Sequence, residues 1–171
     1  MSELKVGDVV VCVVKKLYPN SALVTIVDEN VEGMIHVSEI ASGWVRDIRH
    51  HLKEGQLVVA KIIRIDEIPH LSIKRVRKEE KKRKLHEYEL EKRARRMLEF
   101  IGKKLGKESE VEEVVKRIKK EIGSLAHAFE LASKDEEVLL KLVDKDWVAA
   151  LKEHAAELFK RKEVEFKAEL S

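Results

Sequence analysis

The sequence predicts a chain in two parts, a small β-barrel followed by a compact all-α helical domain. Five short runs rich in β-branched and other apolar residues lie within the first 76 residues, separated by turn residues. From Arg77 the composition changes to Glu, Lys, Leu and Ala, with apolar residues at helical spacing. Five strands in this order, with Gly33-Met-Ile-His-Val-Ser-Glu-Ile40 leaving the third, are typical of the OB fold, which makes RNA the first partner to consider.

The first domain is assigned to residues 1–76, and its predicted strands lie at residues 6–16, 22–27, 31–37, 57–66 and 70–76. Turn residues at Pro19-Asn-Ser21 separate the first two strands. Gly33 is expected to allow a tight turn into the strand that carries His36. Cys12, the single cysteine, lies in an apolar run and is interpreted as a buried core residue.

Residues 77–162 are assigned to the helical domain. Its first helix has an apolar face at Leu90, Ala94, Met97, Leu98, Ile101 and Leu105. Ser109 and Glu112 match a capping box at the start of the second helix, and Gly123 is expected to end that helix. Further helical segments are predicted at residues 125–132, from Ser133 onward and at 146–161, the last with Trp147 on its apolar face.

The last stretch, residues 163–171, alternates charged and apolar side chains, which is the pattern of a half-buried strand. No sequence remains for it to pair with, so we interpret it as the start of a truncated third, α/β domain. The alternative is that this strand pairs with another molecule or frays.

Positive charge is concentrated in the middle of the chain. The total is 35 Lys and Arg against 32 Asp and Glu, but residues 71–105 hold fourteen against six. No apolar run approaches the roughly 20 residues needed to span a bilayer, and the N-terminus lacks the apolar core of a signal peptide. We therefore expect a cytoplasmic protein without a membrane partner.

Two segments of the barrel are candidate RNA contacts. The imidazole of His36 is placed to stack on a base or hydrogen-bond to it, although it could equally pack at the barrel rim. The loop Ser42-Gly-Trp-Val-Arg-Asp-Ile-Arg49 offers an aromatic ring and two guanidinium groups. In this loop we expect Trp44 to pack against the barrel with Val45 and Ile48, and Arg46 to be the better candidate for contact.

A basic band follows the last strand, at Lys74-Arg-Val-Arg-Lys78 and Lys81-Lys-Arg-Lys84. Such a band would attract a phosphate backbone in a salt-sensitive way, although neighbouring glutamates could also neutralise a solvated helix face. The residues predicted to bind nucleic acid are His36, Arg46, Arg49, Lys74, Arg75 and Arg77.

Signals for catalysis are poor. Gly102-Lys-Lys-Leu-Gly-Lys-Glu-Ser109 differs from a phosphate-binding loop in its glycine spacing, in Glu108 and in following a helix instead of a strand. The histidines show no metal-ligand spacing. The sequence therefore predicts no enzyme, no cofactor, no metal site and no small-molecule substrate.

Seven segments carry a resemblance to a known family: Gly7-Asp-Val, Val13-Val-Lys-Lys-Leu17, Val31 to Ile40, Trp44-Val-Arg-Asp-Ile-Arg49, Leu52-Lys-Glu-Gly-Gln56, Val59 to Asp66 and Leu71 to Val76. They resemble the S1-motif domain and, more closely, the alpha subunits of archaeal translation initiation factor 2. The resemblance implies an S1-type barrel, then a helical domain, then an α/β domain beginning near Val164.

The resemblance also implies a function. In that family a heterotrimeric, GTP-dependent factor delivers initiator tRNA to the small ribosomal subunit, and the third domain of the alpha subunit docks on the gamma subunit. The first two domains would contribute contacts to tRNA and to mRNA, and Arg46 matches the Val/Ile-Arg step of the motif.

The sequence departs from the family in two places. Eukaryotic relatives carry a regulatory phosphoserine followed by three arginines; here the stretch is Ala41-Ser-Gly-Trp44, in which Ser42 is the nearest hydroxyl and the arginines are missing. S1 domains also carry two aromatic residues where this chain has Asn20 and Leu23, so base stacking on the strands should be weak. Two other functions stay open: a generic S1-type module of an RNA-processing assembly, or a protein-interaction spacer without RNA contact.

Overall fold

The computed structural model describes residues 4–170, and side chains as far as residue 160. The chain forms two compact units, one ending at Leu85 and the other beginning at His86. The division falls inside helix α1 (Lys78–Leu105), several residues beyond the expected end of the barrel domain at Val76. Each unit is described by itself.

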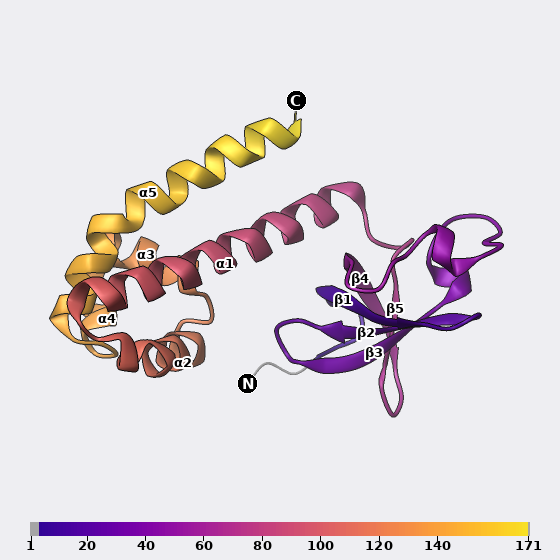
Figure 1. The fold of residues 1–171 in the computed structure, drawn as a ribbon, viewed down its shortest axis with the longest axis horizontal. Helices are drawn as coiled ribbons and strands as arrows, with labels where there is room; N and C mark the ends of the chain where they lie inside the picture. Colours follow the sequence, from indigo (N-terminus) through magenta and orange to yellow (C-terminus); the bar gives the residue numbers. More distant parts are fainter. Residues whose placement is uncertain (1–3, 171) are drawn as a thin grey trace. The chain divides into compact units, whose positions relative to one another are not determined.

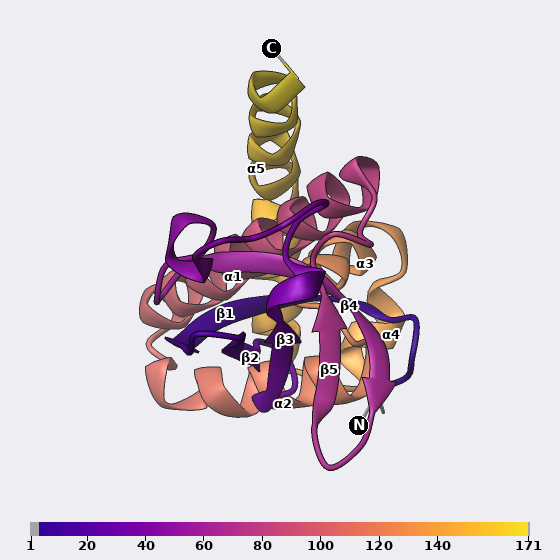
Figure 2. The same ribbon diagram turned by 90° about the vertical axis from the view of Figure 1, so that its right-hand side faces the viewer.

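The first unit is a closed barrel of five strands, as the sequence predicts (Figures 1 and 2). The strands are β1 (Val9–Leu17), β2 (Ser21–Ile26), β3 (Val31–His36), β4 (Leu57–Ile65) and β5 (Pro69–Ser72). Their order around the barrel is β1-β2-β3-β5-β4. The pair β3 and β5 is parallel, with Met34 opposite His70, whereas the other neighbours are antiparallel.

Alternate residues of the strands fill the barrel, because successive side chains of a strand point to opposite faces. Cys12 lies in this core with no exposed surface, and burial raises the pKa of its thiol to about 12. The interpretation of Cys12 as a buried core residue is confirmed. The other core residues include Val14, Ala22, Val24, Ile26, Ile35, Ile62 and Leu71.

Gly33 has a different function from the predicted one. It lies within β3 opposite Val24, not at a turn. A Cβ at this position would come within 2.5 Å of Leu71 Cδ1 and 3.1 Å of the Pro69 carbonyl oxygen. The missing side chain therefore allows β3 and β5 to approach closely. In the turn between β2 and β3, the residue with a positive φ is Asn30, at 53°.

Strand β5 is shorter than predicted and ends at Ser72 instead of Val76. The backbone N–H groups of Ile73 and Lys74 both donate to the carbonyl oxygen of Glu39, at 2.9 and 3.1 Å. These donors are therefore used by a loop and do not extend the sheet.

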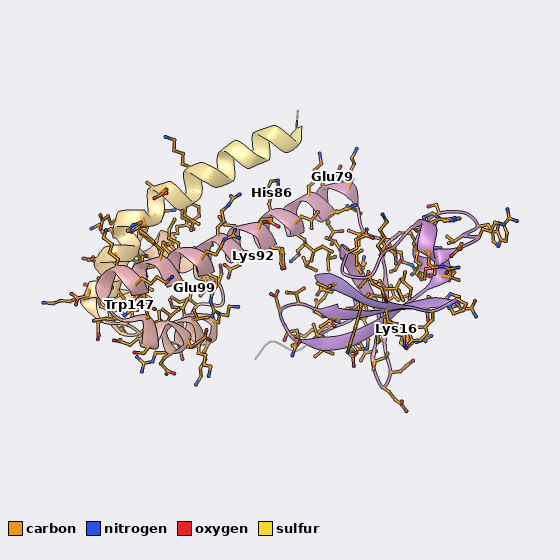
Figure 3. The ribbon with its side chains drawn as sticks, viewed as in Figure 1. Lys16, Glu79, His86, Lys92, Glu99 and Trp147 are labelled. Atoms are coloured by element: carbon orange, nitrogen blue, oxygen red, sulfur yellow. The ribbon has the colours of Figure 1, made fainter. Side chains whose placement is uncertain are left out.

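The second unit is a helical domain, again as predicted. After α1 it contains α2 (Val111–Glu121), α3 (Leu125–Lys134), α4 (Glu136–Leu140) and α5 (Lys145–Leu170). Trp147 and Phe129 are its largest fully buried side chains, and Trp147 is labelled in Figure 3. Of the residues predicted for the apolar face of α1, Leu90, Ala94, Leu98 and Ile101 are buried, while Met97 and Leu105 are partly buried against the same core.

The predicted capping box is wrong. Residues Glu108–Glu110 form a 3₁₀ turn before α2, and the cap position, Glu110, makes no side-chain hydrogen bond. The carboxylate of Glu112 instead binds the guanidinium of Arg95 from α1. Gly123 ends α2 as expected, with φ +93°.

A true cap is found at α3. The Ser124 hydroxyl accepts from the N–H of His127 at 3.2 Å. The carboxylate of Glu91 from α1 accepts from the N–H groups of Leu125 and Ala126, at 3.0 and 2.8 Å. These contacts fix the start of α3 to the side of α1.

The strand predicted after residue 162 is contradicted, because α5 is assigned as far as Leu170. An isolated strand has no partner for its backbone, whereas a helix makes its hydrogen bonds internally, and Glu, Lys, Ala and Leu all favour helix. The side chains of residues 161–170 lie outside the described part. The assignment of residues 163–171 to a third domain stays a prediction.

We expect Gly33→Ala to destabilise the barrel by roughly 1–3 kcal/mol, because the added methyl group would press on Leu71 and on the Pro69 carbonyl. The measurement is urea unfolding followed through the NMR signals of barrel amides. Adding Leu71→Val should make room for the methyl group, so the double variant should be more stable than the sum of the two single changes predicts. Simple additivity would argue against this contact as the cause.

Candidate nucleic-acid interface

The loop between β3 and β4 is anchored at both ends. It begins with the 3₁₀ turn Val37–Glu39 and reaches a second 3₁₀ turn at Ile48–His50. Ile40 before the tip and Ile48 after it are buried in the barrel core. The expectation that Ile48 anchors the loop is confirmed. The segment between Ile40 and Ile48 is therefore held to the barrel at both ends.

Trp44, in contrast, does not pack against the barrel. Its exposed fraction is 85 %, so the prediction that it anchors the loop is wrong. Gly43, just before it, has φ +87°, a conformation that favours glycine and turns the chain at the loop tip. Ser42 is exposed in the same tip.

The two arginines of the loop differ in their electrostatic surroundings. Arg49 pairs with Asp47, whose Oδ1 and Oδ2 lie 3.3 Å from Nε and Nη2 respectively. The backbone N–H of Arg49 also donates to Asp47 Oδ1 at 3.0 Å, and this bond, followed by the bonds from the guanidinium, lowers the pKa of Asp47. Arg46 is exposed, and within the described residues it has no ion pair.

Arg46 and Arg49 both line a hollow in the barrel surface. Its lining residues are Leu17 at the end of β1, Tyr18 and Pro19 directly after it, and Arg46, Asp47, Ile48, Arg49 and His50 from the loop. Tyr18 is 39 % exposed, and the ammonium of Lys16 lies 5.5 Å from its ring centroid. Tyr18 and His50 were not among the residues predicted to bind nucleic acid; the sequence showed only that Tyr18 precedes the predicted turn at Pro19-Asn-Ser21.

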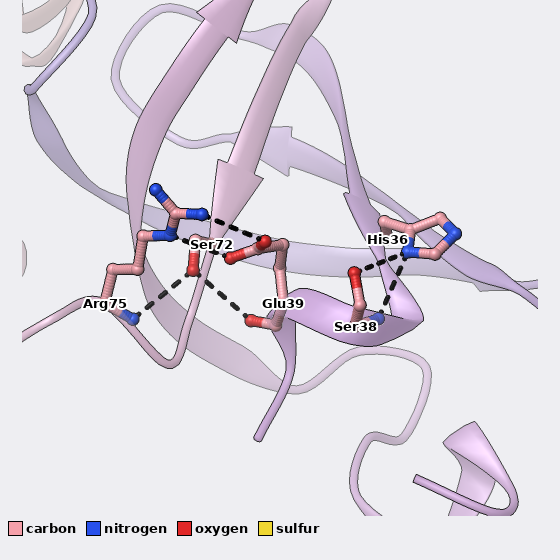
Figure 4. A network of polar contacts seen from close by, with 5 residues as sticks. All are labelled: His36, Ser38, Glu39, Ser72 and Arg75. Carbon is pink, nitrogen blue, oxygen red and sulfur yellow. Dashed lines mark hydrogen bonds and ion pairs between the residues drawn. The ribbon is translucent and has the colours of Figure 1, made fainter. Parts of the chain in front are cut away.

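His36 acts as a cap for the first 3₁₀ turn. The N–H of Ser38 donates to His36 Nδ1 at 3.2 Å, and the Ser38 hydroxyl oxygen lies 2.7 Å from the same atom (Figure 4). The side chain remains exposed. The imidazole is therefore exposed at the end of β3, while its Nδ1 is used within the turn.

Arg75 is held by Glu39. The guanidinium donates from Nε and Nη2 to the two carboxylate oxygens of Glu39, at 3.0 and 3.3 Å (Figure 4). The backbone N–H of Arg75 donates to the Ser72 hydroxyl at 3.3 Å. Desolvation opposes ionisation of Glu39, but the Ser72 hydroxyl, the Arg75 guanidinium and the charge of Lys74 outweigh it and lower the pKa of Glu39. Much of the charge of Arg75 is therefore already compensated.

Lys74 and Arg77 flank this ion pair and are both exposed. Neither makes an ion pair with any residue in the described part of the chain. The predicted nucleic-acid residues thus divide into exposed cations without an ion pair in the described part of the chain (Arg46, Lys74 and Arg77), cations paired with a carboxylate (Arg49 and Arg75) and the capping residue His36.

The structure also addresses three other features considered above: a metal site, a membrane span and the glycine-containing segment at Gly102. Among the described residues there is no group of three or more His, Cys, Asp or Glu side chains that could hold a metal ion. The described helices include none that is both long enough and apolar enough to cross a bilayer. Gly102 is buried in α1, where a Cβ would come within 2.5 Å of Val111 Cγ2, so it serves helix packing.

Comparison with protein families gives two matches along the chain. Residues 3–74 match the S1 RNA binding domain, and residues 110–171 match the eukaryotic translation initiation factor 2 alpha subunit. Curated relatives include translation initiation factor 2 subunit alpha of Thermococcus kodakarensis, which is 42 % identical over 154 residues, covering 85 % of this chain and 56 % of the relative. The subunit from Methanopyrus kandleri is 41 % identical, covering 88 % and 60 %.

Solved structures agree with these matches. A crystal structure of a complex of the initiation factor 2 alpha subunit, aDim2p and rRNA from Pyrococcus horikoshii contains a chain of TM-score 0.75 and 39 % identity, covering 91 % of this chain and 97 % of that one. The intact alpha subunit of initiation factor 2 from Pyrococcus abyssi has TM-score 0.73 and 38 % identity, covering 88 % and 60 %. The chain spans between half and two thirds of the length of the curated relatives named above.

We expect Glu39→Gln to destabilise the barrel by about 1 kcal/mol at neutral pH, because Arg75 would lose its charged partner. Because the folded-state pKa of Glu39 is lowered, its contribution is full above the ordinary glutamate pKa of about 4.3 and is lost as pH falls through the lower folded-state value. The variant should therefore show a flatter decline of stability with acid, measured by urea unfolding at several pH values.

The matched control is Glu67→Gln, which changes an exposed carboxylate on the same unit. Its stability should follow that of the unmodified chain at every pH. An equal effect of the two changes would mean that the Glu39–Arg75 pair does not stabilise the barrel.

Proposed function

Since the chain belongs to the family of alpha subunits of translation initiation factor 2, we propose that it binds RNA as part of a translation initiation factor. It would contribute contacts to initiator tRNA, and to mRNA on the small ribosomal subunit, within a heterotrimeric, GTP-dependent complex. A gamma subunit would bind GTP and would be contacted through a third domain. The site of action would be the cytoplasm.

The observation that carries the proposal is the exposed guanidinium of Arg46 beside a hollow on an S1-type barrel. A phosphate group gains most from a cation that has no competing carboxylate, because no existing ion pair must be broken. Lys74 and Arg77 are two more exposed cations, on the segment that follows the barrel; neither makes an ion pair in the described part of the chain, although the charge of Lys74 also acts on Glu39. The structural relative from Pyrococcus horikoshii was solved in a complex that includes rRNA, which supports an RNA ligand.

We propose binding and presentation of RNA, without catalysis. The thiol of Cys12 is buried and has a pKa of about 12, so it is not a nucleophile at neutral pH. His36, the histidine predicted to contact RNA, caps a turn through its side chain. Ser42 lies in an exposed loop tip and stays a candidate for phosphorylation, which the sequence supports only by position.

The test is fluorescence anisotropy of labelled initiator tRNA at two salt concentrations. Changing Arg46, Lys74 and Arg77 together to alanine should weaken binding and reduce the slope of log affinity against log salt by about 2 to 3, close to one unit for each phosphate that is no longer neutralised. Arg75 is left unchanged, because its removal would also disturb Glu39.

A charge-matched control removes three other exposed lysines, Lys116, Lys119 and Lys120 on α2. This control should bind like the unmodified chain. Equal losses of affinity in both variants would indicate attraction by net charge alone. Failure of the folded, unmodified chain to bind RNA even at low salt would favour the protein-interaction spacer.

A further inference from the structure

The cations that follow β5 are not equivalent. Lys74, Arg75 and Arg77 all lie in one short segment and are exposed. Lys74 and Arg77 make no ion pair in the described part of the chain, although the charge of Lys74 acts on Glu39. Arg75, in contrast, directly faces the carboxylate of Glu39. A carboxylate therefore lies inside the basic surface that the proposed function assigns to RNA.

Glu39 contacts this segment through two separate groups. Its backbone carbonyl accepts the N–H groups of Ile73 and Lys74, at 2.9 and 3.1 Å. Its side-chain carboxylate accepts from Nε and Nη2 of Arg75, at 3.0 and 3.3 Å (Figure 4). The first contact attaches the backbone of the segment to the barrel and does not depend on the charge of the side chain. Removing that charge would therefore free Arg75 while the backbone stays attached.

The pair has the geometry by which arginine also binds phosphate. A guanidinium presents two parallel N–H groups along one edge, and the oxygens of a carboxylate or of a phosphate both fit that edge. Glu39 occupies the edge formed by Nε and Nη2 of Arg75. A phosphate at the opposite edge would approach the negative charge of Glu39, which opposes its binding. The carboxylate therefore competes with phosphate for Arg75 both by position and by charge.

The two partners differ in their exposure to solvent. The side chain of Arg75 is 54 % exposed, whereas that of Glu39 is 13 % exposed. A ligand can therefore reach the guanidinium without displacing another part of the barrel. Glu39 would still be stabilised if Arg75 turned away, because the Ser72 hydroxyl and the charge of Lys74 also favour its ionised form. An exchange of partners thus leaves no uncompensated buried charge.

We propose that the carboxylate of Glu39 is an intramolecular competitor of RNA. It holds Arg75 in place of a phosphate, and so keeps the RNA affinity of the segment at residues 74–77 below what its cations allow. This inference rests on the proposed function and adds a residue that sets the affinity of the same surface. The competing group on RNA is a phosphate, so the effect should not depend on base sequence.

Release of Arg75 differs measurably from a general gain in net charge. Removing any carboxylate makes the chain more positive and can strengthen RNA binding through the overall field. Only an additional cation bound to phosphate displaces a further counterion, and this number sets the slope of log affinity against log salt. The salt slope therefore distinguishes a new phosphate contact from a change in net charge.

The experiment is fluorescence anisotropy of labelled initiator tRNA with the full chain over a range of salt concentrations. Glu39→Gln should raise the affinity about fivefold at low salt and steepen the slope by close to one. The matched control, Glu67→Gln, removes an exposed carboxylate from the hairpin between β4 and β5 and should leave the slope unchanged. Circular dichroism checks that each variant is folded.

Double variants test whether the gain depends on Arg75. Arg75→Ala should lower the slope by close to one in the Glu39→Gln chain, but by much less in the unmodified chain, where the guanidinium faces the carboxylate. Arg75→Lys in the Glu39→Gln chain should keep most of the gain, because lysine also binds phosphate. A loss of fold would affect both substitutions at position 75, whereas loss of a phosphate contact affects only the alanine.

Failure of the competition and failure of RNA binding give different results. If the unmodified chain binds tRNA but Glu39→Gln has the same slope as Glu67→Gln, the inference is overturned while the proposed function stands. The same conclusion follows if Arg75→Ala lowers the slope equally with and without Glu39. If neither the unmodified chain nor the folded variants bind tRNA at low salt, the proposed function and the inference both fail.

Discussion

The arrangement of the candidate interface depends on one pairing, the parallel contact of β3 with β5 that closes the barrel. It requires the absence of a side chain at Gly33, because Leu71 and the Pro69 carbonyl already occupy that space. Parallel strands end at the same edge of a sheet. The turn after β3 and the segment after β5 therefore leave the barrel together, which explains why Glu39 can bind Arg75 although 36 residues separate them in the sequence.

The cations in this region divide into those that pair with carboxylates and those that do not. Arg75 and Arg49 each face a carboxylate, and these pairs order the segments that carry the remaining cations. The Glu39 carbonyl also accepts the N–H groups of Ile73 and Lys74, so the chain that presents Lys74 and Arg77 is fixed to the barrel before it enters α1. A count of positive residues overestimates the charge available to RNA, because the arginines that face carboxylates are already compensated.

Sequence patterns predicted what depends on local periodicity. The five strands, the apolar faces of the helices and the burial of Cys12 followed from alternation and helical spacing. What failed was decided by tertiary contacts. Glu112 could cap its own helix, but Arg95 competes for it, and the close approach at Gly33 involves a strand far along the chain. The alternation after residue 162 indicated a strand, yet a strand without a neighbour is less stable than a longer helix.

Trp44 shows most clearly why the candidate nucleic-acid interface was harder to predict than the fold. Apolar character alone places tryptophan inside, and only the structure shows that Trp44 is exposed while Ile48 of the same loop is buried in the core. The same fact separates binding from stability along this surface. A change at Glu39 or Arg75 alters the barrel itself, whereas a change at the loop tip removes a ring that the barrel does not need. The residue at the loop tip can therefore change without cost to the fold, as expected for an exposed loop on a packed scaffold.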